Sequence, residues 1–196
     1  FNPQRRDLDW RRSLGFADDV PVIGFIGRQV MEKGLDVFSD TIDQLTARKV
    51  PHKVLVVGEG PARNWFESRL PEAVFAGFQG GADLGRAVAS MDILFNPSVT
   101  ETFGNVTLEA MASGLPVVAA GATGSASLVA EGVTGRLVVP TSKAADANAF
   151  AEALAPYCLD PALRAAHGAA GETRACEFSW EAINAVVADT YVRLVE

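Results

Sequence analysis

The chain has 196 residues, of which 48% are hydrophobic and 21% charged. This balance fits a folded domain and excludes disordered, collagen-like and disulfide-scaffold proteins. The net charge of −7 argues against a nucleic-acid-binding protein, because phosphate backbones are bound by clustered Lys and Arg side chains.

Six short apolar runs predict strands at residues 20–27, 53–57, 74–76, 93–96, 117–120 and 137–139. Helical patterns lie between them, at 35–45, 61–70, 83–90, 105–113 and 125–130, and three further helices follow at 145–157, 161–176 and 180–195. Alternating strands and helices, with strands apolar on both faces, favour a parallel sheet covered on both sides. We therefore expect an α/β fold, a doubly wound Rossmann-like six-stranded parallel sheet with a C-terminal helical tail.

The two cysteines and the termini bear on location and completeness. Cys158 and Cys176 form no metal-binding spacing with the two histidines, so we expect two reduced thiols in the core and a cytoplasmic protein. No apolar run approaches the roughly 20 residues that span a bilayer. The chain opens Phe1-Asn-Pro3 without an initiator Met, and we expect it to be a piece of a longer protein.

Ligands of such sheets bind outside the carboxyl ends of the strands, so the residues that follow each strand matter most. After the first strand comes Gly27-Arg-Gln-Val-Met-Glu-Lys-Gly34. Arg28 and Lys33 place two cations near a helix N-terminus, where free N–H groups already favour an anion. The pair predicts a phosphate clamp, with solvated surface cations as the alternative.

The second strand is followed by Gly58-Glu-Gly60-Pro-Ala-Arg63. This begins like the dinucleotide fingerprint, but Arg63 stands where the third glycine is required and Pro61 removes an N–H. We reject an NAD site. A tight turn into a helix and one wall of a nucleotide pocket both remain open.

The segment after the fourth strand is the richest in polar groups. Glu101 lies in the loop, and Glu109 lies about one turn inside the next helix. The N–H groups at the start of that helix have no intrahelical acceptor, and they belong to Phe103, Gly104, Asn105 and Val106. Carboxylates beside N–H donors suit a ligand with hydroxyls at both ends and phosphates between, namely a nucleoside diphosphate sugar. The alternative is a solvated helix N-terminus with ordinary acidic capping.

Three motifs together resemble one family. Gly-Arg-x4-Lys-Gly, Glu-x7-Glu within ETFGNVTLE, and the following EAMASGLPVVA are similar to the retaining glycosyltransferases of the GT-B fold, family 4, over about residues 15–195. The resemblance implies the C-terminal, donor-binding half of that fold. Many members carry Gly-Gly-x-Pro-Glu after the fifth strand, whereas this chain has Gly121-Ala-Thr-Gly-Ser-Ala-Ser127 and lacks the acidic residue.

The resemblance also implies roles for the residues above. Arg28 and Lys33 would bind the donor diphosphate, with Gly27 allowing close approach, and would stabilise the leaving group without a metal or other cofactor. Glu101 would accept hydrogen bonds from the sugar, and Glu109 from the ribose. The N–H groups of residues 103–106 would cradle phosphate or sugar, and the loop from Phe75 to Phe78 would contact the base, chiefly through its backbone groups. Asp7-Leu-Asp9 matches an Asp-x-Asp metal motif, but it precedes the first strand, and we do not expect a metal there.

We therefore expect residues 1–196 to form one donor-binding domain, with a post-linker segment at 1–17 and a helical tail at 141–196. The N-terminal acceptor domain would be absent from this chain, which alone would have little transferase activity, and the last helix would cross back onto that domain. The expected reaction is hexosyl transfer, with GDP-mannose favoured over UDP-hexoses. The sequence gives no sign of membrane contact, although the full-length protein remains open to peripheral attachment. The alternatives are a stand-alone nucleotide-binding regulatory module and a GT-B sugar-nucleotide epimerase.

Overall fold

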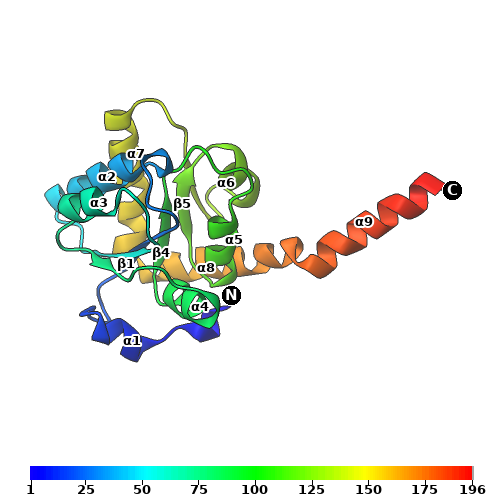
Figure 1. Cartoon of the computed structure of the whole chain (residues 1–196), viewed down its shortest axis with the longest axis horizontal. Coiled ribbons are helices and arrows are strands. Elements are labelled where there is room, and N and C mark those ends of the chain that lie inside the picture. The colour runs from blue at the N-terminus through cyan, green and yellow to red at the C-terminus, as the bar shows by residue number, and fades with distance from the viewer. Residues whose placement is uncertain (196) are drawn as a thin grey trace.

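The computed structural model describes residues 1–195, except for some side chains in three of the helices. Its centre is a sheet of six parallel strands in the order β3-β2-β1-β4-β5-β6 (Figure 1). The strands are β1 (Val22–Ile26), β2 (Lys53–Val57), β3 (Val74–Phe75), β4 (Ile93–Asn96), β5 (Val117–Ala120) and β6 (Gly135–Val138). The expected doubly wound fold is confirmed, and each strand lies within three residues of its predicted bounds.

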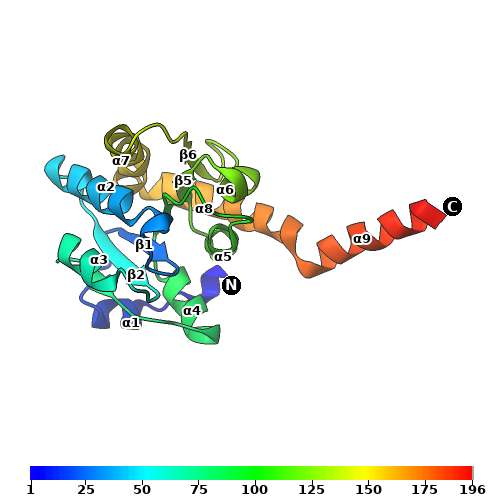
Figure 2. The ribbon, with the colours of Figure 1, turned by 45° about the horizontal axis from the view of Figure 1, so that its top comes forward.

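Helices cover both faces of the sheet, as the apolar strands require. The first face packs against α2 (Leu35–Ala47), α3 (Arg63–Arg69) and α7 (Lys143–Leu159). The second packs against α4 (Gly81–Ala89), α5 (Asn105–Ala112), α6 (Thr123–Leu128) and α8 (Pro161–Ala175). Figure 2 shows α2 and α3 on one side of the sheet and α4 and α5 on the other.

Aromatic rings fill the core beneath the first face. Phe38 of α2 lies edge-on to Phe25 at 5.6 Å and stacks on Phe95 at 4.8 Å between centroids. Phe66 of α3 also meets Phe25 edge-on, and Phe150 of α7 lies 5.0 Å from Phe95. These contacts join three helices to the two central strands, and aromatic pairs in this geometry stabilise a core beyond the area they bury.

The N-terminal segment at residues 1–17 is partly helical. It contains a 3-10 turn at Pro3–Arg5 and α1 (Leu8–Ser13). Asp7 caps α1 by accepting from the backbone N–H of Trp10 at 2.9 Å, and Asp9 pairs with Arg12. A helix of six residues is too short to show a periodic pattern, so the sequence analysis missed it. The Asp-x-Asp pair thus serves a helix start and a surface ion pair.

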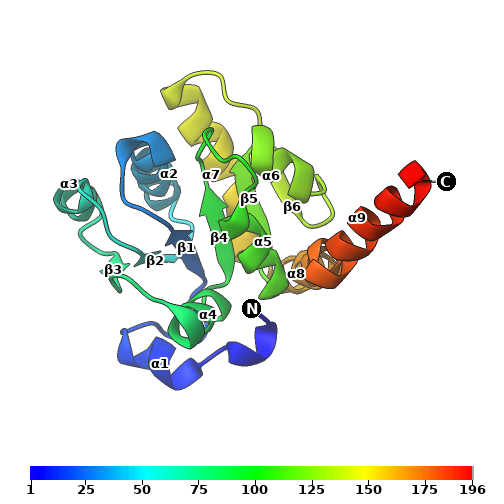
Figure 3. The same cartoon turned by 45° about the vertical axis from the view of Figure 1, so that its right-hand side comes forward.

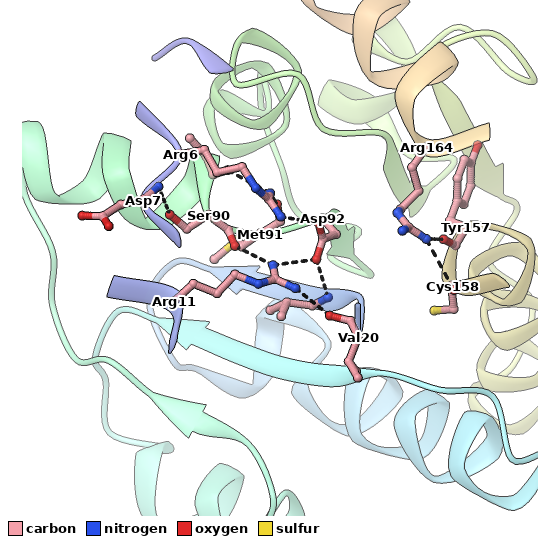
Figure 4. Close-up of polar contacts among 12 residues, drawn as sticks. Arg6, Asp7, Arg11, Val20, Ser90, Met91, Asp92, Tyr157, Cys158 and Arg164 are labelled. Atoms are coloured by element: carbon pink, nitrogen blue, oxygen red, sulfur yellow. Dashed lines mark hydrogen bonds and ion pairs between the residues drawn. The ribbon is translucent and has the colours of Figure 1, made fainter. Parts of the chain in front are cut away.

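A buried ion cluster fixes this segment to the sheet. Arg11, only 1% exposed, donates to Asp92 at 2.7 Å and to the carbonyl oxygen of Val20 at 2.6 Å, and Arg6 donates to the other Asp92 oxygen at 2.8 Å. Figure 4 shows both guanidinium groups converging on Asp92. Asp92 also accepts from the backbone N–H of Val22 at 2.8 Å, so the cluster locks residues 1–17 to the amino ends of β1 and β4.

The described part of the C-terminal tail is mainly helical, with α9 (Trp180–Val195) following α8 after a 3-10 turn at Cys176–Phe178. Pro156 lies near the end of α7, and Pro161 begins α8. Figures 1 and 3 show α9 extending away from the sheet and its covering helices. Among the described residues, no helix is both long and apolar enough to cross a membrane.

The expectation of two core thiols is wrong for one of them. Both cysteines are free, but Cys158 is buried and Cys176 is exposed. Cys158 lies on the inner side of α7, where burial raises the pKa of its thiol to about 12. Cys176 begins the 3-10 turn between α8 and α9. The sequence could not distinguish the two cysteines, because the alanine-rich residues around them do not show which face of a helix is buried.

Candidate functional site

The sheet order creates one point where two neighbouring strands lead to helices in opposite directions along the sheet. β1 and β4 are adjacent, and the chain proceeds from β1 towards β2 and from β4 towards β5. The loops that follow these two strands therefore diverge and leave a crevice, which is where parallel sheets bind ligands. The structure places residues 27–34 and 97–104 on either side of this point.

An ion pair joins the two loops. Lys33 Nζ lies 2.7 Å from Glu101 Oε1, and their side chains are 27% and 16% exposed. The neighbouring Thr100 hydroxyl lies 3.4 Å from the carbonyl oxygen of Glu32. Two of the residues proposed from the sequence thus meet directly. An ammonium has three N–H donors, so Lys33 keeps donor capacity for a second anion.

Arg28 lies at the start of the same loop and is exposed. Within the described part of the chain its guanidinium pairs with no carboxylate. Gly27, immediately before it, has φ 141°, a backbone conformation that residues other than glycine rarely adopt. The turn at Gly27 therefore directs Arg28 to the surface as a cation free to meet a ligand.

Gln29 is a feature that the sequence analysis missed. Its side chain is fully buried, and its Nε2 donates to the carbonyl oxygen of Gly58 at 2.7 Å, while its backbone N–H donates to Glu59 at 2.9 Å. The loop after β2 is thus held against the loop after β1. Arg63 pairs with Glu67 of its own helix at 2.8 Å. These contacts support the tight-turn interpretation of residues 58–63. The burial of Gln29 between Arg28 and Val30 gives no signal in the sequence.

The start of α5 presents a row of backbone donors. Gly104 precedes the helix with φ 91°, which again favours glycine. In the described part of the chain, no backbone carbonyl outside the helix accepts from the N–H groups of residues 103–106, and the first N–H groups of a helix have no intrahelical acceptor. Phe103 and Asn105 are exposed, and Gly104 is buried. The donors expected from the sequence are therefore free, and they lie directly after the Glu101 loop.

Glu109 lies on α5 and is half-buried, with no ion pair in the described part of the chain. Burial raises the pKa of its carboxyl above the ordinary range. Glu109 is carried by α5 itself, whereas Lys33 and Glu101 lie in the segments that precede α2 and α5. An unpaired, partly buried carboxylate is costly for folding, and such a group is a candidate ligand-binding residue.

Phe78 follows β3 and is 75% exposed. The backbone N–H of Gly58 donates to Gly77 at 2.8 Å, and the side chain of Gln79 donates to Ala76 at the same distance. These bonds fix the loop at the carboxyl end of β3, on the rim that also carries the loops after β1 and β2. An aromatic ring this exposed is available to a planar ligand.

Among residues 1–195, no group of three or more His, Cys, Asp or Glu side chains is arranged to hold a metal ion. The site therefore consists of two cations, two carboxylates and a row of N–H donors. A parallel sheet that carries these groups at its switch point defines an α/β domain suited to a phosphate-containing ligand.

Comparison with known proteins identifies the family. A sequence profile described as "Glycosyl transferases group 1" matches residues 20–159, and the chain belongs to this family. A GDP-mannose-dependent alpha-mannosyltransferase of Corynebacterium glutamicum is 31% identical over 93% of the chain, which spans 42% of that relative. One of the same name from Mycolicibacterium smegmatis is 39% identical over 70% of the chain, which spans 35% of that relative.

Solved structures agree on the fold. Sucrose-phosphate synthase of Thermosynechococcus elongatus superposes with a TM-score of 0.81 at 27% identity, over the whole chain and 51% of that protein. HepE of Anabaena in complex with UDP gives 0.78 at 27% identity, over 98% of the chain and 56% of that protein. The structure is thus similar to one half of GT-B glycosyltransferases, as the sequence motifs implied.

Proposed function

We propose that this chain is the donor-binding half of a retaining, metal-independent glycosyltransferase that moves a hexose, specifically mannose, from a nucleoside diphosphate sugar to an acceptor. Membership of the family supports glycosyl transfer. The two relatives described above are GDP-mannose-dependent mannosyltransferases, which supports GDP-mannose as the donor. A UDP-bound structural neighbour supports a nucleoside diphosphate at the site.

The observation that carries the proposal is the Lys33–Glu101 ion pair beside the free N–H row of residues 103–106. Arg28 and the remaining donors of Lys33 would bind the diphosphate by charge-assisted hydrogen bonds. Glu101 would accept from the hydroxyls of the sugar, and Glu109 from those of the ribose. Phe78 would contact the base.

Glycosyl transfer requires stabilisation of the leaving group, the nucleoside diphosphate. The bond between the anomeric carbon and the phosphate oxygen breaks, and its electron pair stays on the departing nucleoside diphosphate. An acceptor hydroxyl forms the new bond to the anomeric carbon on the same face and gives its proton to the leaving phosphate oxygen. Arg28 and Lys33 would stabilise the negative charge where it develops, which is usually the largest single contribution to such catalysis.

A second, acceptor-binding domain is part of the proposal, with residues 1–196 as a single donor-binding unit. The chain spans about half or less of the relatives it matches. On the rim of the site, Val99 is 50% and Phe103 41% exposed. On α9, Ile183, Val187 and Tyr191 are exposed at four-residue spacing, the apolar stripe of a helix that docks on another surface. These exposed residues support a covering domain and an α9 that crosses onto it.

Titration of the chain with GDP, UDP and ADP, with magnesium and with a chelator, tests the donor site. We expect one diphosphate to bind, with an affinity that the chelator leaves unchanged and that Arg28→Ala lowers strongly. Binding that requires magnesium would refute metal independence. The full-length protein with GDP-mannose and an acceptor then tests transfer, and the anomeric configuration of the product tests retention.

The two alternatives gain no support from the comparisons, since the relatives described above are transferases. An epimerase would convert the sugar nucleotide without an acceptor, which the same assay detects. A regulatory module would bind nucleotide equally well after Glu109→Ala, whereas this substitution should weaken nucleotide binding by the proposed donor site. The cytoplasmic location and the absence of any cofactor stay predictions.

A further inference from the structure

Phe103 makes a contact that the proposed donor chemistry does not use. Its backbone N–H belongs to the free row before α5, but its ring packs against Phe178, with the two centroids 6.2 Å apart and the planes at 65°. Phe178 lies in the 3-10 turn at Cys176–Phe178, far along the chain from the donor loop. The loop that would hold the donor therefore touches the junction of α8 and α9.

Phe178 also lies next to the start of α9. Ser179 follows it, and the Ser179 hydroxyl accepts from the backbone N–H of Ala182 at 3.1 Å, which caps the first turn of the helix. Since α9 extends away from the sheet (Figures 1 and 3), the junction is where this helix is attached to the rest of the domain. A change in the direction of α9 must begin beside Phe178.

Arg174 fixes the other side of Phe178. Its guanidinium lies 5.9 Å from the centre of the Phe178 ring, and it donates to the carbonyl oxygens of Leu128 at 2.6 Å and Ser127 at 3.1 Å. Both carbonyls are at the end of α6. Arg174 of α8 thus contacts both the Phe178 ring and the end of α6.

The start of α6 meets the donor loop directly. The backbone N–H of Gly124 donates to the carbonyl oxygen of Glu101 at 3.0 Å. A side chain at Gly124 would clash with the backbone of Phe103 and Gly104. The segment 101–104 is therefore held from two sides, its backbone by α6 and its aromatic ring by Phe178.

We infer that Phe178 is a positioning residue for the donor site, and that its contact with Phe103 couples the orientation of α9 to nucleotide binding. This inference rests on the proposed function. Movement of α9 would shift Phe178, and Phe178 would shift the N–H groups next to Phe103. Coupling between two sites is reciprocal, so a bound nucleotide must also restrict the α8–α9 junction.

Calorimetric titration of the chain with GDP, UDP and ADP tests this. Phe178→Ala should weaken binding of the diphosphate that the wild type prefers by about twofold to tenfold, the range of one aromatic pair. Phe178→Tyr should restore it, and Phe178→Ala should have no further effect in a Phe103→Ala background. Tyr191→Ala, at an exposed position of α9, is the control and should bind like wild type.

Hydrogen exchange gives the second readout, which a merely structural role of Phe178 would not change. Nucleotide should slow exchange at residues 176–183 as well as at 103–106 in the wild type, and only at 103–106 in Phe178→Ala. Two results would overturn the coupling but not the donor site. Either Phe178→Ala binds nucleotide as tightly as wild type, or nucleotide still slows exchange at residues 176–183 in that variant. Absence of binding by the wild type overturns the proposed donor site, and the coupling with it.

Discussion

Lys33 and Glu101 are 68 positions apart in the sequence, yet Lys33 Nζ and Glu101 Oε1 lie 2.7 Å apart. The pair bridges the loops after β1 and β4, at the point where the direction of the sheet connections reverses. Lys33 can also meet a ligand while it pairs with Glu101, because an ammonium has three N–H donors.

Substitution of the two partners should separate phosphate binding from sugar binding. Lys33→Gln should weaken binding of the nucleoside diphosphate roughly tenfold to hundredfold, the value of hydrogen bonds to a charged group. Glu101→Gln should leave that affinity unchanged or higher, because it frees Lys33, while it weakens binding of the complete sugar nucleotide. Calorimetry with both ligands measures the difference, and equal losses for the two variants with both ligands would contradict these roles.

The Glu109 carboxylate should lower the stability of the folded domain and strengthen the binding of nucleoside diphosphate. Burial raises the pKa of its carboxyl above the value in the unfolded chain, so ionisation disfavours the folded state as pH rises through the raised pKa. Glu109→Gln removes this cost and should unfold at higher urea concentration than wild type at about pH 7, with the difference shrinking as the pH is lowered through that pKa.

The same variant should bind nucleoside diphosphate roughly tenfold more weakly, because the amide replaces a charged acceptor. Glu72→Gln, at a carboxyl 87% exposed, is the control and should change neither property. A Glu109→Gln protein that binds as wild type would remove Glu109 from the donor site.

Breaking the buried cluster at the N-terminal segment should destabilise the domain strongly. Asp92→Asn leaves Arg11, which is 1% exposed, without its charged partner, and the loss of one partner of a buried ion pair costs about 3 kcal/mol or more. Asp18→Asn breaks the exposed pair with Arg12 and should have little effect. Urea unfolding of the two variants measures the contrast, and similar midpoints would show that the cluster adds little.

The two thiols should differ in reactivity. Cys158 is 4% exposed and the pKa of its thiol is raised by burial to about 12, whereas Cys176 is exposed. A disulfide reagent at neutral pH should therefore modify one thiol quickly in the native chain and both in urea. Cys176→Ser should abolish the fast reaction, and a fast reaction that persists in that variant would show that α7 opens readily.

The local elements could be predicted from the sequence because their signals are local. Apolar runs marked the strands, and the spacing of Leu35, Phe38, Ile42 and Leu45 marked α2. The short motifs indicated the family and its candidate site residues. Helix α1 and the burial of Gln29 escaped prediction, since six residues carry no period and a buried amide looks like any other polar residue.

What only the tertiary structure decided are contacts between distant segments. The pairing of Lys33 with Glu101, the clamp of Arg11 on Asp92 and the packing of Phe103 on Phe178 depend on strand order and helix placement. Periodicity in the sequence states which face of an element is buried, but not which other element covers it. Long-range packing settles that choice, because it minimises the apolar surface and the unpaired charge left to the whole chain.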